Sequence, residues 1–365
     1  MNPLWLTQIR AIVRIEMKKT FFAKRGLWIY LLAMAPVALF FAHSMVEIYM
    51  HGARQQVALK GARRLTEQDL GAIHTGMSRN EVIAALGDPP KSNRMRRRLR
   101  NGRNSLSIPF EVFRYSDGDS DLAISIENDT VTGTARTSAP SLGQDSYIFA
   151  GVFQFFFIRL AIFFGCLGIF MNLFRGEMLD KSLHFYLLSP VRREILVVGK
   201  YLAGLLAATI IFTTSTALQL ISLLIQFDSN AISQYLYQNH GLSQIAAYLG
   251  VTVLACIGYG SIFLAAGLLF RNPIVPAAAV LIWEAANPVL PALLKKISVI
   301  YYLKSLCPVD VPVDPGMPAL FVLLVSNPKP ISSVIAVFGL LLLSVAILAT
   351  AAKWARRLEI NYTTD

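Results

Sequence analysis

The sequence is poor in charged residues and in cysteine. Only 15% of its 365 residues are charged, whereas 55% are hydrophobic, a balance that excludes an ordinary soluble globular domain of this length. Cysteine occurs three times: Cys166 and Cys256 lie inside apolar runs, and Cys307 lies in a proline-rich connection. Such a distribution gives neither a disulfide framework nor the spacing of a metal site. The chain is expected to use lipid as part of its solvent.

Motifs for catalysis are also missing. The five histidines are dispersed without an HExxH pattern, so no metal site or catalytic residue is predicted. The nucleotide-binding pattern GxxxxGK followed by Ser or Thr does not occur, because Gly199 and Lys200 are followed by Tyr201. The chain is therefore not expected to bind and hydrolyse ATP, or to carry any cofactor, by itself.

The start of the chain lacks a short apolar core followed by a small-residue cleavage site, so no cleaved signal peptide is expected. The net charge is +12, and many of the Lys and Arg residues flank apolar runs. Cations at such positions determine which side of the membrane each loop occupies. Nucleic-acid binding is not expected.

Apolar runs long enough to cross a membrane, which takes about 20 residues, occur repeatedly. They predict an α-helical polytopic membrane protein with six transmembrane helices and a small α+β extracytoplasmic domain inserted between the first and second. The predicted spans are residues 26–45, 147–174, 201–227 and 242–270, a fifth directly after Arg271–Pro273, and 331–352. The segment 295–330 is broken by prolines and predicts re-entrant or surface-lying helices.

Residues 1–25 predict an amphipathic helix at the cytoplasmic membrane interface. Its apolar arc contains Ile9, Ile12 and Val13, and its opposite face is cationic. That face suits anionic headgroups, although a helix packed on protein would show the same pattern. Glu16 falls inside the apolar arc, where it is expected to need a polar partner on another element.

Residues 46–146 are polar and rich in turns, and predict the extracytoplasmic domain. Thr66 and Ser78 predict the starts of two short helices, and Gly87 the end of the second. Three candidate strands follow, separated by DGDS and NDT. The basic run between helices and strands, KSNRMRRRLRNGRN, is interpreted as a solvated loop, with contact to anionic lipid headgroups as the alternative.

Positive charge in short loops predicts both termini and the connection 175–200 in the cytoplasm of a bacterial inner membrane. The connection 228–241 has no Lys or Arg, which predicts that it lies on the opposite side of the membrane. The same scheme of spans places the insert on that opposite side too. Lys295, Lys296 and Lys304 argue mildly against this scheme.

Several polar side chains lie deep in apolar runs, where they are costly and usually face a bundle interior or water. Arg159 and Glu284 are hypothesised to pair or to line the interior together; otherwise Arg159 reaches an interface and Glu284 lies near one. Gln154, Gln219 and the stretch 213–216 favour a polar lining.

The connection reading FRGEMLDKSLHFYLLSPVRREILVVGKYLAG resembles the coupling segment of type-2 ABC exporter permeases. The features, in order, are Glu177, the step from Leu187 and Leu188 to Ser189 and Pro190, the bases Arg192 and Arg193, and the Gly199–Lys200 pair. The resemblance implies a cytoplasmic ATPase subunit that carries ATP and Mg²⁺, a second permease copy, either identical or related, and export of a substrate. An ordinary basic cytoplasmic loop is the simpler alternative.

Within the insert, Gly76–Met77–Ser78, Glu81–Val82 and Leu86–Gly87–Asp88–Pro89 resemble the small outer-membrane assembly lipoprotein module (SmpA/OmlA-like), together with FEVFRYSDG. This resemblance implies a fold and an extracytoplasmic protein partner. It also keeps open a different function, in which an ATPase drives movement of the external domain without passage of a substrate.

Overall fold

The computed structural model describes residues 3–22, 26–61, 65–101, 104–179, 192–270, 274–311 and 331–356. It divides into two compact units. The helical unit comprises Met1–Phe41 and Leu142–Asp365, and the inserted unit comprises Ala42–Ser141. The chain therefore leaves the helical unit once and returns to it.

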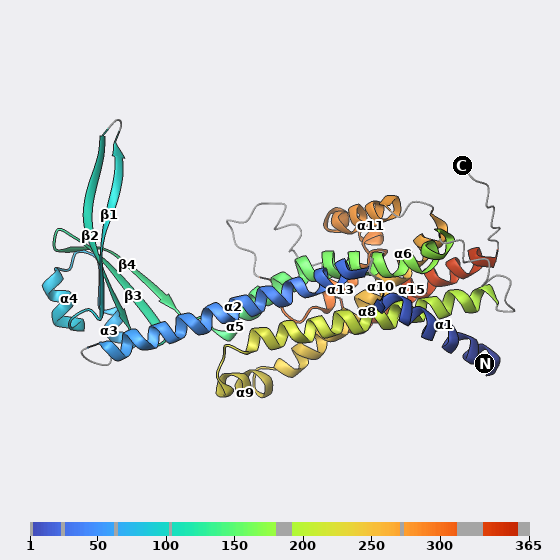
Figure 1. Ribbon diagram of the computed structural model, residues 1–365, viewed down its shortest axis with the longest axis horizontal. Helices are drawn as coiled ribbons and strands as arrows, with labels where there is room; N and C mark the ends of the chain where they lie inside the picture. The colour runs from blue at the N-terminus through green and yellow to red at the C-terminus, as the bar shows by residue number, and fades with distance from the viewer. Residues whose placement is uncertain are drawn as a thin grey trace. The chain divides into compact units, whose positions relative to one another are not determined.

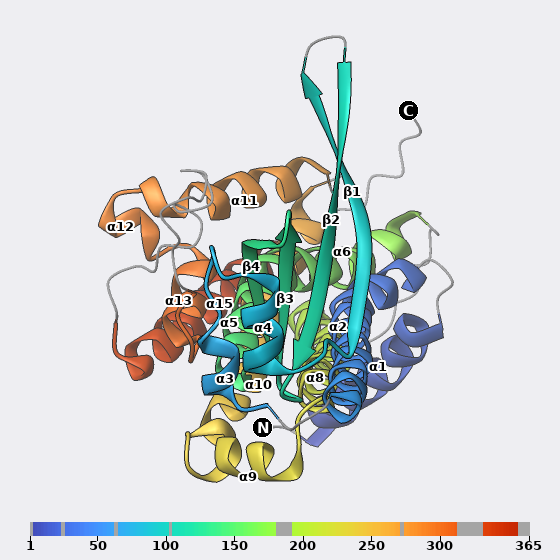
Figure 2. The ribbon, with the colours of Figure 1, turned by 90° about the vertical axis from the view of Figure 1, so that its left-hand side faces the viewer.

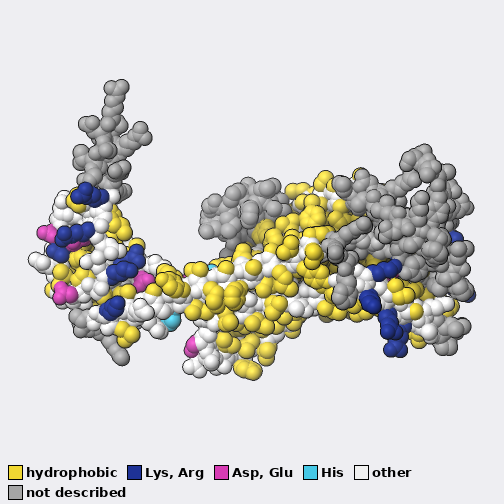
Figure 3. Space-filling model, viewed as in Figure 1, with side chains coloured by type: hydrophobic (Ala, Val, Ile, Leu, Met, Phe, Trp, Pro, Cys, Tyr) yellow, Lys and Arg dark blue, Asp and Glu magenta, His cyan; other side chains and the backbone are white. Residues whose placement is uncertain are grey.

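Long apolar helices make up the helical unit (Figure 1). Five helical stretches of the described residues are long and apolar enough to cross a membrane. They are α2 (Leu27–Lys60), Leu142–Phe174, which contains α5 (Leu142–Val152), η2 (Phe153–Ile162) and most of α6 (Phe163–Leu179), then α8 (Arg193–Leu224), α10 (Gly241–Leu269) and α15 (Ser333–Arg356). Hydrophobic side chains cover most of the visible described surface of this unit (Figure 3), as expected of helices in lipid.

The predicted fifth span corresponds to α11 (Ile274–Ala286), which is shorter than a membrane crossing. Its 13 residues rise about 20 Å, against a hydrocarbon core of about 30 Å. Pro288, in the 3-10 turn η3 (Asn287–Val289), ends it, and the short helices α12 (Ala292–Lys295) and α13 (Val299–Leu306) follow. The count of six spans stays a prediction; α13 is the described helix of the predicted re-entrant segment, and residues 312–330 lie outside the described residues.

Helix α10 lies at the centre of the bundle and packs against α6, α8, α13 and α15. Close approach depends on glycine, as is typical of membrane helices. Phe170 of α6 is fully buried between Gly204 of α8 and Gly260 of α10. A Cβ atom added at Gly260 would lie 2.5 Å from the Phe170 ring, so even alanine at this position requires the buried ring to shift.

The predicted amphipathic helix is α1 (Pro3–Phe22). It packs against α8, and its buried stripe includes Ile12 and Glu16. Arg10, Arg14 and Lys18 are exposed, and Lys and Arg side chains gather over this helix in Figure 3. Helix α1 is amphipathic and its buried side faces protein, while its place at the cytoplasmic membrane interface stays a prediction.

The inserted unit contains two short helices and a four-stranded antiparallel meander (Figure 2). The helices are α3 (Glu67–Gly71) and α4 (Arg79–Leu86), and the strands are β1 (Lys91–Asn101), β2 (Asn104–Ser116), β3 (Ser120–Glu127) and β4 (Thr130–Ser138). The interpretation of the basic run as a loop was wrong, because residues 91–101 form β1. Backbone pairing with β2 holds this strand in register from Lys91–Arg114 to Asn101–Asn104, an interaction that hydrophobic patterning does not reveal.

Strand β3 alternates strictly between buried and half-buried residues. Its Leu122, Ile124 and Ile126 pack with Phe113 and with Val82 of α4 in the core of this unit. Tyr115 lies in the same core and donates a hydrogen bond to the Gly87 carbonyl at 2.9 Å. Burial raises the pKa of Tyr115 to about 12, so the phenol keeps the proton that it donates.

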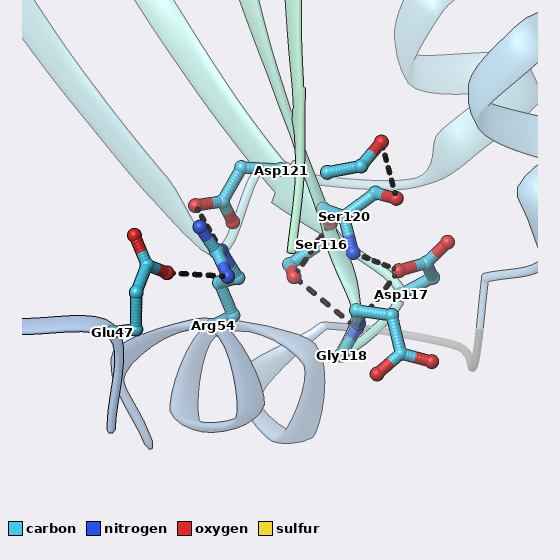
Figure 4. A network of polar contacts seen from close by, with 9 residues as sticks. Glu47, Arg54, Ser116, Asp117, Gly118, Ser120 and Asp121 are labelled. Atoms are coloured by element: carbon cyan, nitrogen blue, oxygen red, sulfur yellow. Dashed lines mark hydrogen bonds and ion pairs between the residues drawn. The ribbon is translucent and has the colours of Figure 1, made fainter. Parts of the chain in front are cut away.

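The turn between β2 and β3 is closed by local polar contacts (Figure 4). Asp117 Oδ1 accepts from the Ser120 amide at 2.6 Å, and Ser116 Oγ accepts from the Gly118 amide at 3.2 Å. Gly118 has φ of 107°, which favours glycine. Arg54 belongs to the part of α2 that lies in this unit, and its side chain is buried. Its Nε atom lies 3.5 Å from Asp121 Oδ2, and its Nη1 atom lies 3.9 Å from Glu47 Oε2.

The two predicted helix starts are confirmed as capping boxes. Ser78 accepts from the Glu81 amide, and the Glu81 carboxylate accepts from the Ser78 amide at 2.7 Å. Thr66 does the same with Asp69. We expect Ser78→Ala to lower the local stability of α4 by about 1 kcal/mol, measured by amide hydrogen exchange on the full-length protein. Protection of α3, which keeps its own cap, is the internal control, and unchanged protection of α4 would contradict the role of the cap.

Glu81 also makes α4 sensitive to acid. Hydrogen bonds from the Ser78 backbone and side chain lower the Glu81 pKa. A carboxyl with a lowered folded-state pKa contributes stability above its unfolded pKa, and this contribution is lost as pH falls through the folded value. Protection of α4, corrected for intrinsic exchange, should therefore fall below pH of about 4, and Ser78→Ala should weaken that dependence.

Candidate coupling site

Two helices end at the borders of the predicted coupling segment. Helix α6 ends at Leu179 and α8 begins at Arg193. The four residues of the step, Leu187, Leu188, Ser189 and Pro190, lie outside the described residues, and the side chain of Glu177 is likewise not described. The site is therefore built from the helices that carry the two ends of this segment and from α1.

The two predicted bases at the start of α8 contact other elements. The guanidinium carbon of Arg192 lies 5.2 Å from the ring centroid of Trp5 on α1, a cation–π contact. Arg193 Nη1 lies 3.5 Å from the carbonyl oxygen of Ala355, in the last turn of α15. A cation at the carboxyl end of a helix is stabilised by the helix dipole. Both bases thus tie the start of α8 to its neighbours.

A buried ion pair lies about two turns further along α8. Lys200 Nζ donates to Glu16 Oε1 of α1 at 2.7 Å and to the Leu173 carbonyl of α6 at 2.7 Å. The Lys200 and Glu16 side chains are 0% and 4% exposed, and the Phe174 ring lies 5.3 Å from the ammonium nitrogen. Lys200, Glu16 and the Leu173 carbonyl are called the α1–α6–α8 node below.

Glycine at the neighbouring position brings the helices close enough for this pair. A Cβ atom added at Gly199 would lie 3.0 Å from Ile12 Cγ2 of α1. Gly199 therefore lets α1 lie directly on α8, and Lys200 then reaches Glu16. The Gly–Lys pair has a physical reason: the glycine allows contact and the lysine neutralises the one acid on the buried stripe of α1.

The node fixes three helices to one another beside the predicted coupling segment. Separating a buried pair leaves a charge without its partner, which typically costs about 3–5 kcal/mol. Because α6 and α8 carry the two ends of the segment, the node links both of these helices to α1. This arrangement suits mechanical transmission, which requires no catalytic group.

Glu284 of α11 makes a second buried polar site. Its carboxylate accepts from Ser298 Oγ at 2.8 Å, from the Val299 amide at 2.9 Å and from the Ile300 amide at 2.8 Å. These donors form the start of α13. A carboxylate at a helix amino terminus satisfies free amides and interacts favourably with the helix dipole. Glu284 therefore anchors α13 within the bundle.

A comparison with family models decides the class of the chain. The model described as ABC-2 family transporter protein matches residues 10–283, more than half of the sequence. The chain belongs to the ABC-2 transporter family. It is therefore a membrane-spanning permease subunit of an ABC transporter, a class that generally pairs with a cytoplasmic ATPase subunit and lacks an ATPase site of its own. Neither the curated proteins nor the solved structures gave a significant match.

The matched range includes the inserted unit as well as the node. The comparisons do not confirm the resemblance of that unit to the small outer-membrane assembly lipoproteins, which stays a prediction. The node and the Glu284 contacts to α13 are therefore features of an ABC-2 family member. The comparisons name no substrate for it.

The remaining polar residues predicted in the permease lie within its helix bundle. Gln219 Nε2 donates to Ser215 Oγ at 3.0 Å, and Ser215 donates to the Ala33 carbonyl of α2. Thr216 and Thr252 join α8 to α10. Gln219 and Thr216 are both 0% exposed. Thr216 connects two helices directly, whereas Gln219 bonds to Ser215 on its own helix, and Ser215 makes the contact to α2. A polar lining formed by these residues stays a prediction.

Gln154 and Arg159 lie on η2, a ten-residue π-helical stretch of the permease, a geometry often found at functional sites. Gln154 Nε2 donates to the Val309 carbonyl, just beyond α13, at 3.0 Å. Arg159 lies within electrostatic range of Glu284, while the hydrogen bonds described for Glu284 go to residues 298–300. The Arg159–Glu284 pair stays a hypothesis.

Sequence reasoning missed the importance of Lys200 as a buried partner. It flagged Glu16 as needing a polar contact and quoted the Gly199–Lys200 pair as part of the resemblance. The sequence did contain the two halves of this pair: one acid on the apolar arc of α1 and one lysine at the start of a span. What the sequence lacks is the packing of α1 on α8 that brings positions 184 residues apart within 2.7 Å.

Proposed function

We propose that this permease couples ATP hydrolysis by a separate cytoplasmic ATPase subunit to export of a substrate across the bacterial inner membrane. The ATPase docks on residues 175–200, with contacts at Glu177, at Leu187–Pro190 and at Arg192 and Arg193, and ATP and Mg²⁺ bind on that partner. Two permease copies, identical or related, enclose the pathway. Both termini and the coupling segment lie in the cytoplasm, and the inserted unit lies outside.

The α1–α6–α8 node is the observation that carries this proposal. A segment that receives a mechanical stroke needs rigid attachment at both ends. The Lys200 contacts to Glu16 and to the Leu173 carbonyl supply that attachment on both flanking helices. The conformational change then takes the form of rigid helices that move together.

The experiment is purification of the tagged full-length chain in mild detergent, with measurement of co-purifying ATP hydrolysis. A Gly-Ser linker in place of residues 187–193 is expected to lower the recovered ATPase activity about tenfold or more, since the docking surface is removed. A linker of equal length in place of residues 228–234, on the predicted outer side, is the matched control and should retain the activity.

Equal loss in both linker variants, with normal size-exclusion profiles, would overturn docking at residues 187–193. Retention of the ATPase in both would do the same. Protease protection of tags at the two termini, in sealed inverted inner-membrane vesicles, checks the orientation: digestion at both is expected.

A second function is favoured by one feature of α2. This helix runs without interruption from Leu27 to Lys60, and its residues belong to the helical unit up to Phe41 and to the inserted unit from Ala42. A continuous helix suits ATPase-driven movement of the inserted unit without passage of a substrate. Cysteine accessibility along the spans during ATP turnover distinguishes the two, because only export requires a hydrated pathway.

A further inference from the structure

The outer half of the β1–β2 hairpin is a two-stranded arm, whose described residues are 95–101 and 104–110. Pairing of β2 with β3 begins only at Glu111, and β1 is at the edge of the sheet, so these residues pair only with each other. Both views show β1 and β2 extending beyond β3 and β4 (Figures 1 and 2). Where its side chains are described, at Met95, Arg96, Pro109 and Phe110, none belongs to the core of the unit. An isolated two-stranded hairpin is only marginally stable in water, so the arm is expected to gain stability from a binding partner.

The arm and its base carry concentrated positive charge. Seven Lys and Arg residues and no Asp or Glu lie between Asp88 and Glu111. Glu111, the nearest acid on β2, is already engaged: it lies 2.6 Å from Arg94 and 3.5 Å from Arg79. The cations further along the arm therefore have no acid near them in the chain sequence, and they favour an external anion.

The strand register separates the charged positions from the apolar ones. Arg94, Arg96, Arg98 and Arg100 occupy alternate positions of β1 and hence one face. Intervening positions include Met95 and Leu99, whose register partners are Phe110 and Leu106. The described Met95 is 43% exposed. The arm thus combines an arginine row with an oppositely placed apolar row that only Arg97 interrupts.

We propose that the arm binds an anionic membrane surface. Lipid headgroup phosphates accept charge-assisted hydrogen bonds from arginine, and each cation near an anionic bilayer adds to the attraction. The apolar row enters the boundary between headgroups and acyl chains, as the apolar face of an interfacial helix does. A bilayer surface presents an anionic layer directly beside an apolar one, which matches both rows. This inference is independent of the ATPase proposal.

An environment-sensitive fluorophore on Met95→Cys tests the proposal in the full-length chain, with Cys166→Ala, Cys256→Ala and Cys307→Ser to remove other thiols. The protein is placed in nanodiscs of phosphatidylcholine, or of phosphatidylcholine with phosphatidylglycerol, and vesicles of either composition are then added. A blue shift is expected with phosphatidylglycerol in the nanodisc or in the vesicles, and it should weaken as salt is raised. No shift in any of these arrangements, or an equal shift with phosphatidylcholine alone, overturns the proposal.

Charge variants decide whether the arginine row is responsible. Arg96→Gln, Arg98→Gln and Arg100→Gln together leave the Arg94–Glu111 pair intact and should reduce the apparent affinity about tenfold or more. Lys60→Gln, Arg114→Gln and Arg136→Gln remove the same charge from exposed positions elsewhere on the unit and should keep it. Arg→Lys at 96, 98 and 100 should also keep it. Loss in the lysine variant with retention in the matched control would show that the shift does not depend on positive charge near the bilayer, and would overturn the lipid proposal.

Discussion

Lys200→Met is expected to lower the free energy of unfolding of the permease by about 3–5 kcal/mol, because it removes the buried cation that lies closest to the Glu16 carboxylate. The Leu173 carbonyl also loses its donor. The thermal midpoint of the purified protein measures the stability effect. ATP hydrolysis by the assembled transporter, well below that midpoint, measures coupling, which we expect to be lost because α1 and α6 no longer move with α8.

Two further variants make this prediction specific to the pair. Glu16→Leu combined with Lys200→Met removes both charges and should be more stable than Lys200→Met alone, since no uncompensated charge remains. Lys19→Met is the control: its side chain is 51% exposed and lies 4.0 Å from Glu16, so a change below about 1 kcal/mol is expected. A double variant as unstable as Lys200→Met would show that the lysine acts by packing and not by charge.

Glu284→Ala is expected to release α13 from the bundle, with a loss of about 3 kcal/mol or more. It leaves the Ser298 hydroxyl and the Val299 and Ile300 amides buried without their acceptor, and each such group costs about 1–3 kcal/mol. Glu284→Gln keeps one acceptor oxygen, so its stability should lie between that of the unchanged protein and that of Glu284→Ala. Hydrogen exchange in α13 is the direct measurement, and the thermal midpoint gives the global effect.

The same site tests the hypothesis that Arg159 pairs with Glu284. Exchanging the two residues preserves a charge pair, but arginine has no acceptor for the three donors at the start of α13. If anchoring of α13 dominates, the exchange variant stays as unstable as the single variants. Recovery of stability by the exchange would show that the Arg159–Glu284 pair matters more than the hydrogen bonds to α13.

The sequence predicted elements best where the signal is local. The cap residue Ser78 and Glu81, three positions apart, were sufficient to place the start of α4, and the buried stripe of α1 followed from its period. The interpretation of the basic run as a loop was wrong, because its many cations leave no clear alternation of apolar and polar residues to indicate strand β1. The structure also gives α11 as a shorter helix than the predicted fifth span, since Asn287 and Pro288 stop it.

By itself the sequence determined that the chain is a membrane protein with an inserted polar domain, because hydrophobic length and composition are properties of contiguous residues. It also determined that Glu16 and Glu284 need partners, because a buried charge is costly wherever it lies. Only the tertiary structure decided which partners they have: Lys200 on α8 for one, and the first amides of α13 for the other. Those contacts arise from helix packing, and packing brings together residues whose separation along the chain carries no local signal.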